Sequence, residues 1–255
     1  MLTVFIIGPA GSGKSTLTAS FSKWLDANDI PAITVNLDPA AEWLPYEPDI
    51  DVRNYLTAQD LMRKYNLGPN GAIIAATDLL ATEALYTIKD EIRSYKTGYV
   101  LIDTPGQMEI FAFRTVGTYI VNELAEERSA ILFLIDSVFA LSPSTFISSL
   151  LLSVSVFYRF SMPQIVVLTK CDLLSEKDVE KAETWISSPE SLLAEFAKEE
   201  TPSRHFNEKI CELITDIVET FKIVPVSSNT GEGLDKLYIL LQQIYTGGED
   251  YVTLP

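Results

Sequence analysis

A glycine-rich segment near the start of the chain combines residue types that can bind phosphate. Residues 8–16 read Gly-Pro-Ala-Gly-Ser-Gly-Lys-Ser-Thr and directly follow an apolar run at residues 2–7. The spacing G-x-x-x-x-G-K-[ST] is typical of a phosphate-binding loop, in which backbone N–H groups turn inward around an anion at the start of a helix. We expect Lys14 to neutralise the β- and γ-phosphates and Ser15 to offer its hydroxyl to Mg²⁺. The segment therefore predicts binding of a nucleoside triphosphate.

An Asp-x-Pro-Gly sequence at residues 103–106 follows another apolar run, Tyr99–Ile102. By itself such a sequence is a common turn, but behind a phosphate-binding loop it is typical of the element that faces Mg²⁺ and the γ-phosphate. We expect Asp103 to hold Mg²⁺ through water and the N–H of Gly106 to face the γ-phosphate. The predicted phosphate-binding residues are Gly11, Ser12, Gly13, Lys14, Ser15, Thr16 and Gly106.

The sequence Thr-Lys-Cys-Asp at residues 169–172 indicates which base is bound, because it is similar to the [NT]-K-x-D element of GTPases. The Asp172 carboxylate can accept hydrogen bonds from the ring and exocyclic N–H groups of guanine, and the stem of Lys170 can cover the base. Adenine has the opposite polarity at this edge and would leave the carboxylate unpaired. The alternative is a Lys–Asp pair in a surface loop. Including two serines after the last predicted strand, the predicted guanine-binding residues are Thr169, Lys170, Asp172, Ser227 and Ser228.

The elements that must position these residues alternate along the chain. Near-continuous apolar runs are expected for strands buried on both faces, and they occur at Val4–Ile7, Ile33–Leu37, Tyr99–Ile102, Ile131–Ile135, Ile165–Leu168 and Ile223–Val226. Helical patterns separate them at Ser15–Ala27, Thr77–Ser94, Ser144–Phe160, Glu176–Glu200 and Leu234–Tyr245. This alternation predicts an α/β fold with a parallel sheet and helices on both of its faces.

The composition favours a globular protein and disfavours a nucleic-acid partner. The chain has 255 residues, of which 47% are hydrophobic and 21% charged, and its formal net charge is −16. Such a surface repels phosphate backbones, so we expect no direct nucleic-acid binding. The two cysteines, Cys171 and Cys211, provide no disulfide framework and suit a reducing compartment, so we expect a cytoplasmic protein. The apolar N-terminus lacks the basic leader of a signal peptide.

An uncharged segment between Asp136 and Arg159 needs a membrane test, since a spanning helix takes about 20 predominantly apolar residues. Pro143 breaks this run and several serines dilute it, so we expect no membrane span. The segment is instead expected to be a helix that begins near Ser142 or Ser144, central to the core or packed on a partner.

Two other features are expected to have no part in catalysis. The acidic stretch at residues 176–200 is most simply a solvated helical face. The sole histidine, His205, is expected in a surface loop, because no cysteine or acidic cluster lies near it at the spacing of metal ligands.

Further stretches narrow the family. Residues 35–40 read Val-Asn-Leu-Asp-Pro-Ala, and residues 46–53 read Tyr-Glu-Pro-Asp-Ile-Asp-Val-Arg. Residues 67–71, Leu-Gly-Pro-Asn-Gly, and residues 107–109, Gln-Met-Glu, complete the set. Gly-Pro-Asn alone would be an ordinary turn. Together with the nucleotide motifs, however, these stretches resemble the GPN-loop GTPases over nearly the whole chain, from residue 8 to residue 228.

The resemblance implies a P-loop NTPase fold, with a mostly parallel sheet, helices on both faces and an inserted helical layer. Residues 1–255 would form a single GTPase domain. Within it, residues 39–75 would be an insertion that carries the Gly-Pro-Asn loop. Residues 140–162 and 173–212 would be helical insertions near a dimer interface or a partner surface.

The resemblance also implies a homodimer that hydrolyses GTP to GDP and phosphate with Mg²⁺ and couples hydrolysis to a conformational change. In similar proteins the Gly-Pro-Asn loop reaches into the partner's nucleotide site, so Asn70 would contact the γ-phosphate or the attacking water in trans. Asp38 matches the family's acid near the γ-phosphate, where it would activate water or hold the water around Mg²⁺. Gln107 and Glu109 match the switch region and would orient water or the opposite loop. The expected metal-site residues are Ser15, Asp103 and Asp38.

Pro9 stands where related dimeric phosphate-loop proteins often carry a second lysine that reaches the partner's phosphates. Proline lacks even a backbone N–H, so the group that completes the site is expected from elsewhere, and Asn70 is the candidate. Eukaryotic members of the family assist RNA polymerase assembly and transport, usually with longer C-terminal tails. This chain looks like a compact, archaeal-type member, for which an unknown protein client, such as RNA polymerase subunits, is expected.

Two alternatives to a homodimeric GTPase stay open at this point. One is an assembly or scaffold protein in which GTP mainly stabilises one shape, motivated by the apolar segment at residues 144–160. The other is a phosphotransferase, since small-molecule kinases share the phosphate-binding loop, with residues 111–114 and Arg159 as parts of a lid. The Thr-Lys-Cys-Asp element argues against ATP use by such an enzyme.

Overall fold

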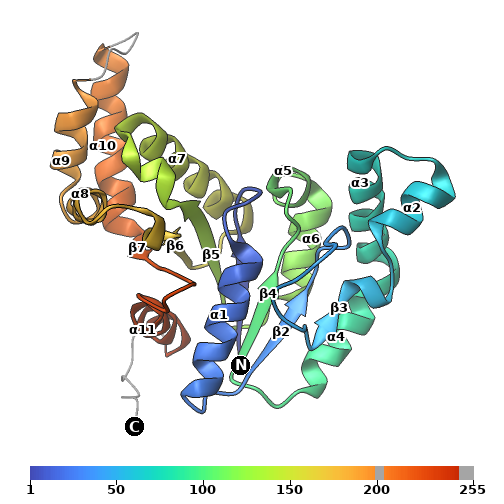
Figure 1. Ribbon diagram of the computed structural model, residues 1–255. Helices are drawn as coiled ribbons and strands as arrows, with labels where there is room; N and C mark the ends of the chain where they lie inside the picture. Colours follow the sequence, from blue (N-terminus) through green and yellow to red (C-terminus); the bar gives the residue numbers. More distant parts are fainter. Residues whose placement is uncertain (199–203, 247–255) are drawn as a thin grey trace.

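Seven parallel strands build one sheet in the computed structural model, which describes residues 1–198 and 204–246 (Figure 1). The strand order is β3-β2-β4-β1-β5-β6-β7, and every neighbouring pair is parallel. The strands are β1 (Leu2–Ile7), β2 (Ala32–Asn36), β3 (Ile50–Asp51), β4 (Tyr99–Asp103), β5 (Ser129–Asp136), β6 (Gln164–Thr169) and β7 (Lys222–Pro225). The six predicted strands are confirmed to within a residue or two. Strand β3 was not predicted, because two residues are too few to form an apolar run. Only its pairing with β2 makes this segment a strand.

Helices cover both faces of the sheet, as predicted (Figure 1). They are α1 (Lys14–Ala27), α2 (Ala58–Tyr65), α3 (Pro69–Leu79), α4 (Leu85–Ser94), α5 (Met108–Phe111), α6 (Thr115–Leu124), α7 (Pro143–Phe160), α8 (Glu176–Ser187), α9 (Pro189–Phe196), α10 (Arg204–Thr220) and α11 (Leu234–Tyr245). Helices α1 and α11 lie on one face, and α4, α6 and α7 lie on the other. Helices α8, α9 and α10 extend the second layer beyond α7.

The central strand, β1, shows why strands of this sheet appear in the sequence as continuous apolar runs. Val4 and Ile6 pack in the core against α1 and α11, whereas Phe5 and Ile7 pack in the core under α4, α6 and α7. Successive side chains of a strand point to opposite faces, so a strand covered by helices on both faces is apolar at nearly every position. Because all seven strands are parallel, their carboxyl ends lie along one edge of the sheet.

Helices α2 and α3 form a hairpin with a small apolar core of its own, made by Ala58, Leu61, Ala72 and Ala76. Thr57 caps α2 by accepting a hydrogen bond from the N–H of Asp60, and Asn66 ends the helix in the left-handed conformation. In Figure 1 this hairpin stands beside the β3 edge of the sheet, away from α7–α10.

The Gly-Pro-Asn sequence, expected to be a loop, begins a helix. Gly68 is the N-cap of α3 and Pro69 is its first residue, so Asn70 lies in the first helical turn. Proline is well suited to this position because its fixed φ matches the helix and its missing N–H is not needed there. The helix predicted from Thr77 accordingly begins eight residues earlier, at Pro69.

One helix among the described residues is long and apolar enough to cross a membrane by length and composition. This helix, Pro69–Ser94, comprises α3, the π-helical turn η2 (Leu80–Ala84) and α4, and the mean hydropathy of its most apolar 18-residue window is 1.3. Of its most apolar window, 44% is buried, and it packs against α6 and β3. A core helix passes the same test, so this finding is weak evidence for a membrane span.

The uncharged segment is helix α7, as predicted, with Ser142 as N-cap and Pro143 as first residue. Its buried side chains join the core, which is one of the two placements expected from the sequence. The acidic stretch is more than a solvated face, because α8 and α9 bury Trp185 and Phe196. It is also divided at Ser188, and residues 199–200 lie outside the described part. His205 has helical backbone in α10 instead of the expected loop.

The position of Gly117 leads to a stability prediction. A Cβ atom on Gly117 in α6 would lie 1.8 Å from the backbone oxygen of Phe111, whereas one on Gly71 in α3 would make only ordinary contacts, at 3.8 Å or more. Gly117→Ala should therefore lower the free energy of unfolding by about 2–3 kcal/mol. Gly71→Ala is the matched control and should raise it by up to about 1 kcal/mol. Urea unfolding monitored by circular dichroism measures both changes, and equal stabilities would contradict this account of α6.

Candidate nucleotide site

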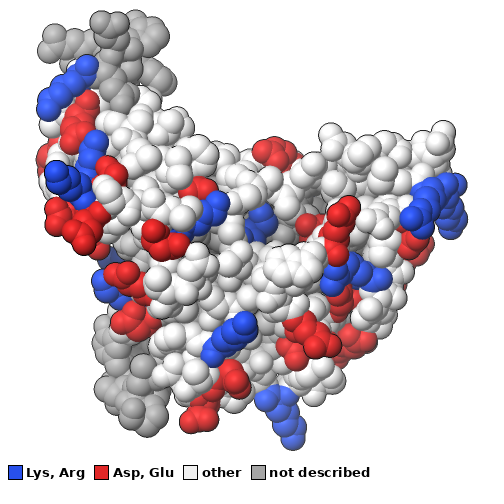
Figure 2. Space-filling model, viewed as in Figure 1, with Lys and Arg blue, Asp and Glu red and all other residues white. Residues whose placement is uncertain are grey.

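The glycine-rich turn joins β1 to α1 at the carboxyl edge of the sheet. Figure 2 shows this edge of the molecule hollowed between the α7–α10 side and the α2–α3 side. Gly11 and Gly13 have φ angles of 76° and 92°, a left-handed conformation that glycine adopts without strain. A Cβ on Gly8 would lie 2.7 Å from Oγ of Ser12 and 2.9 Å from the oxygen of Leu134, so the turn is tightly packed on β5. The sequence thus folds into the compact loop that the motif predicts.

Lys14 folds back over this loop. Its Nζ donates hydrogen bonds to the backbone oxygens of Gly8, at 2.9 Å, and Pro9, at 3.0 Å, and reaches that of Gly106 at 3.5 Å. Burial lowers the pKa of Lys14, while the negative charges of Asp103, Asp38 and Glu109 act in the opposite direction. The ammonium group therefore lies between the two turns that were predicted to surround the phosphates.

Asp103 ends β4 and is almost fully buried. Burial raises its pKa to about 6, although the Ser15 hydroxyl, the Tyr46 phenol and the Lys14 ammonium oppose this shift. The phenol of Tyr46 donates to Oδ2 at 3.1 Å, while the buried Oδ1 has no hydrogen-bond partner in the described part of the chain. Carboxylate and hydroxyl oxygens are the donors that Mg²⁺ prefers, so this unpartnered oxygen fits the predicted metal site.

Asp38 lies beside the Asp-x-Pro-Gly turn. Its Oδ2 accepts a hydrogen bond from the N–H of Gly106 at 3.0 Å, and its Oδ1 accepts one from Ala40 at 2.9 Å. The Gly106 N–H, predicted to face the γ-phosphate, is therefore donated to Asp38 in this structure. A carboxylate and a phosphate oxygen are both anionic acceptors, so one can replace the other at this N–H.

The Thr-Lys-Cys-Asp element lies next to the phosphate-binding loop. A cavity of about 210 Å³ lies between them, lined by Gly13, Thr16, Thr169, Lys170, Asp172, Leu173, Ser228 and Asn229. Asp172 accepts hydrogen bonds from Ser227 and from Asn229, each at 2.8 Å, and these two donors lower its pKa. The carboxylate is thus kept ionised at the mouth of a cavity that four of the five predicted guanine-binding residues line.

The hydroxyl groups of two predicted guanine-binding residues bond other parts of the site. The Thr169 hydroxyl is buried and donates to the backbone oxygens of Ser12, at 2.8 Å, and Ile135, at 3.2 Å, and so ties β6 to the phosphate-binding loop. Ser227 is also buried and supports Asp172. Lys170 adopts a left-handed conformation, and its Nζ pairs with Asp136 at 2.6 Å, which fixes the direction of its stem.

Asn70 and the predicted switch residues lie on the β4 side of β1, whereas the base cavity lies on the β6 side. Within one chain, Oδ1 of Asn70 accepts a hydrogen bond from Nε2 of Gln107 at 3.3 Å. Glu109 is exposed in α5 and lies close enough to Lys14 to affect its pKa. The Gly-Pro-Asn element therefore lies beside the turn that is predicted to face the γ-phosphate.

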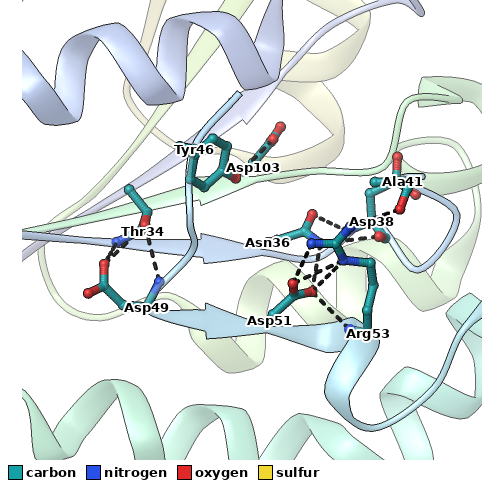
Figure 3. A network of polar contacts seen from close by, with 9 residues as sticks. All are labelled: Thr34, Asn36, Asp38, Ala41, Tyr46, Asp49, Asp51, Arg53 and Asp103. Carbon is teal, nitrogen blue, oxygen red and sulfur yellow. Dashed lines mark hydrogen bonds and ion pairs between the residues drawn. The ribbon is translucent and has the colours of Figure 1, made fainter. Parts of the chain in front are cut away.

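Three residues near the site were given no role from the sequence. Tyr46 reaches Asp103, and Arg53 pairs with Asp51 close to Asp38 (Figure 3). Asn229 reaches Asp172 at the base cavity. Tyr46 and Arg53 lie in the stretch at residues 46–53 that marked the family, so a signal for them was present. Asn229 directly follows the two serines assigned to the base, but nothing in its local sequence indicated its partner.

Comparisons with known proteins agree with this geometry. A family profile described as a conserved hypothetical ATP-binding protein matches residues 6–247. A GPN-loop GTPase of Pyrococcus abyssi is 33% identical over 246 residues, which cover 96% of this chain and 97% of that protein. The crystal structure of its apo form has a TM-score of 0.85 at 32% identity, again covering 96% of this chain and 97% of that one. The chain belongs to the GPN-loop GTPase family.

Two other GPN-loop GTPases that resemble this chain are longer. GPN-loop GTPase 1 of Dictyostelium discoideum is 31% identical over 98% of this chain but only 62% of its own length. The corresponding protein of Schizosaccharomyces pombe is 35% identical over 91% of this chain and 65% of its own length. The chain thus spans slightly less than two thirds of these two relatives and nearly all of the archaeal one, which confirms the expected likeness to a compact archaeal GPN-loop GTPase.

Proposed function

We propose that this protein is a homodimeric GTPase that hydrolyses GTP to GDP and phosphate and couples hydrolysis to a change in the dimer. The observation that carries the proposal is the convergence of three groups at one edge of the sheet. Asp172 is an acceptor for a guanine base, Lys14 lies over a phosphate-binding loop, and the Asp38 carboxylate occupies the N–H of Gly106. The names of the relatives support GTP as the nucleotide, although the description of the family profile names ATP binding.

The chain's own residues suggest how the site works. Bound phosphates would replace the loop carbonyls as partners of the Lys14 ammonium. The γ-phosphate would then accept the hydrogen bond from the N–H of Gly106 in place of Asp38. The Asp38 carboxylate, released from this N–H, would lie next to the γ-phosphate. From there it can orient the attacking water and accept its proton. The Asp38 carboxylate would therefore be free to act on water only when a γ-phosphate replaces it at the N–H of Gly106.

Ser15 and Asp103 would hold Mg²⁺, with Asp38 near the surrounding water. When bound, the ion neutralises charge on the phosphate oxygens. The oxygen available to the ion is the unpartnered Oδ1 of Asp103, because the phenol of Tyr46 already donates to Oδ2. Burial and the Asp103 charge raise the pKa of Tyr46 far above its ordinary value, so the phenol stays protonated and remains a donor to Oδ2.

Phosphate release from GTP and from ATP at equal concentrations, with Mg²⁺ and with a chelator, tests the proposed activity. We expect turnover of GTP only, and only with Mg²⁺. Equal turnover of ATP would contradict the assignment of the base. Transfer of labelled phosphate to an acceptor other than water would favour a phosphotransferase, and tight GTP-dependent client binding without turnover would favour the scaffold.

Mixing two inactive variants tests whether Asn70 acts in trans. Lys14→Ala removes the phosphate contact but keeps Asn70, and Asn70→Ala does the reverse. If Asn70 acts across a dimer, a mixed dimer has one intact site, so an equal mixture should regain up to about a quarter of the wild-type rate. No recovery after subunit exchange would mean that Asn70 serves its own chain, next to Gln107. Each variant mixed with itself is the control.

We also propose a protein client and action in the cytoplasm, without a direct nucleic-acid or membrane partner. RNA polymerase subunits are the clients suggested by the family resemblance. Purified subunits should bind more tightly to the protein loaded with a non-hydrolysable GTP analogue than to the GDP form. Equal or absent binding in the two states would contradict this client.

A further inference from the structure

Two cross-strand contacts hold the loop that carries Asp38 and Tyr46. The short strand β3 pairs with β2 in a register that places Asp51 opposite Asn36. At this end of the pair, Nδ2 of Asn36 donates to Oδ1 of Asp51 at 2.9 Å. At the other end, Asp49 accepts hydrogen bonds from the N–H and hydroxyl of Thr34, at 2.7 and 3.0 Å. Figure 3 shows the first contact directly beside Asp38 and the second one away from it.

Asn36 connects β3 to Asp38. It is fully buried, and both its amide nitrogen and its amide oxygen have hydrogen-bond partners. Its Nδ2 also donates to the backbone oxygen of Asp38 at 3.3 Å, and its Oδ1 accepts the N–H of Asp38 at 3.0 Å. An ionised carboxylate can only accept, so Asp51 requires the NH₂ of Asn36 to face it. The amide oxygen is then left to bind the N–H of Asp38, which fixes the backbone of that residue.

Arg53 holds both Asp51 and the loop. Its guanidinium forms a fork on the two carboxylate oxygens of Asp51, with contacts of 2.6 to 3.0 Å. A remaining N–H donates to the backbone oxygen of Ala41 at 3.0 Å, three residues after Asp38. Burial alone would raise the pKa of Asp51, but the hydrogen bonds from Arg53 and Asn36 outweigh it and lower the pKa. Asp51 therefore stays ionised and keeps the role of acceptor.

We propose that Asp51 and Arg53 are positioning residues that aim the Asp38 carboxylate at the N–H of Gly106. The chain of contacts runs from Arg53 through Asp51 and Asn36 to the backbone of Asp38, while Ala41 is held directly. Asp38 then places one oxygen 3.0 Å from the Gly106 nitrogen. This inference rests on the proposed function, in which Asp38 acts beside the γ-phosphate. In the described part of the chain the guanidinium bonds Asp51 and Ala41 and forms no hydrogen bond with a predicted phosphate-binding residue.

The experiment compares Arg53→Ala, Arg53→Lys and Asp51→Ala with the control Asp49→Ala. Asp49 also bonds a buried β2 side chain 15 residues earlier, so its loss costs comparable stability without freeing Asp38. For Arg53→Ala and Asp51→Ala we expect kcat to fall about tenfold to a hundredfold, as for a misplaced catalytic group. The Kd for fluorescent GDP should change less than about twofold, because GDP lacks the phosphate that Asp38 faces. Arg53→Lys, which keeps the charge but lacks the fork, should recover only part of kcat.

Two further measurements distinguish positioning from a general loss of stability. In an Asp38→Ala background, Arg53→Ala should lower kcat no further, since its effect acts through Asp38. Hydrogen exchange of residues 37–47 should rise in Arg53→Ala, while exchange of the phosphate-binding loop stays unchanged. A fully additive loss of kcat, or an equal loss in Asp49→Ala, would overturn the inference.

Failure of the proposed function would look different. If the wild-type protein hydrolyses no GTP, the GTPase proposal fails, and hydrogen exchange alone then tests whether Arg53 holds the loop. If the wild-type protein hydrolyses GTP but Arg53→Ala changes neither kcat nor exchange at residues 37–47, the positioning role is wrong and the GTPase proposal stands.

Discussion

Asp38→Ala should abolish nearly all GTP turnover while leaving GDP binding intact. The carboxylate lies 3.0 Å from the Gly106 nitrogen, at the turn expected to face the γ-phosphate, and no other acidic side chain in the described chain bonds that N–H. Loss of a positioned proton acceptor typically costs 10²–10⁴-fold in rate, so we expect kcat to fall at least about a hundredfold. Phosphate release under single-turnover conditions and the Kd of fluorescent GDP measure the two quantities.

Glu42→Ala is the control for Asp38→Ala. Glu42 is an exposed acid in the same loop, and its removal changes the charge of the loop equally. Its kcat should stay within about twofold of the wild-type value, since exposed substitutions away from a site have small effects. An unchanged kcat in Asp38→Ala would eliminate both of the expected roles of Asp38, in water activation and around Mg²⁺.

Asp172→Asn should convert the base preference from guanine to xanthine. The carboxylate is held by Ser227 and Asn229 at the mouth of the cavity and can accept from the two N–H groups of guanine. An amide presents one donor in place of an acceptor, which suits the C2 carbonyl of xanthine and opposes the C2 amino group of guanine. Loss of hydrogen bonds to a charged group, at about 1.5–3 kcal/mol each, should weaken GTP binding about 10²–10⁴-fold.

Steady-state kcat/KM for GTP and for xanthosine triphosphate measures this change. The variant should prefer xanthosine triphosphate, whereas Asp235→Asn, at an exposed position in the first turn of α11, should keep the wild-type preference. A variant that still prefers GTP would show that Asp172 does not bind the base. A lower melting temperature of the variant, equal with GTP and with xanthosine triphosphate, would instead reveal damage to the Ser227 and Asn229 contacts.

The motifs predicted the local structure correctly because the residues of each motif are contiguous in the chain. A phosphate-binding loop is a strand, a turn and a helix that are consecutive in the chain, so residue types such as Gly11, Gly13 and Lys14 are sufficient to specify it. The apolar runs predicted the buried strands for the same reason, since alternation of side chains between two covered faces acts on neighbouring residues. The parallel order then requires the strand ends, with Asp103 and Thr169, to meet at one edge.

Contacts between distant positions could not be predicted in this way. Tyr46 reaches Asp103 and Asn229 reaches Asp172, and both pairs are separated by 57 positions in the chain. Strand β3 has only two residues and exists through its pairing with β2, which places Asp51 against Asn36. The helical start at Pro69 was likewise missed, because the sequence Gly-Pro-Asn is compatible with a turn as well as with the beginning of a helix.

The sequence by itself determined the parallel α/β fold and the family and predicted the nucleotide, because all three follow from local residue patterns and their order. Only the tertiary structure decided what each polar group faces. It placed Asp38 on the Gly106 N–H, left Oδ1 of Asp103 without a partner and linked Arg53 to Asp38 through two side chains. The physical reason is that a buried polar group must find its hydrogen bonds wherever the packed chain brings a partner, and that place depends on the whole fold.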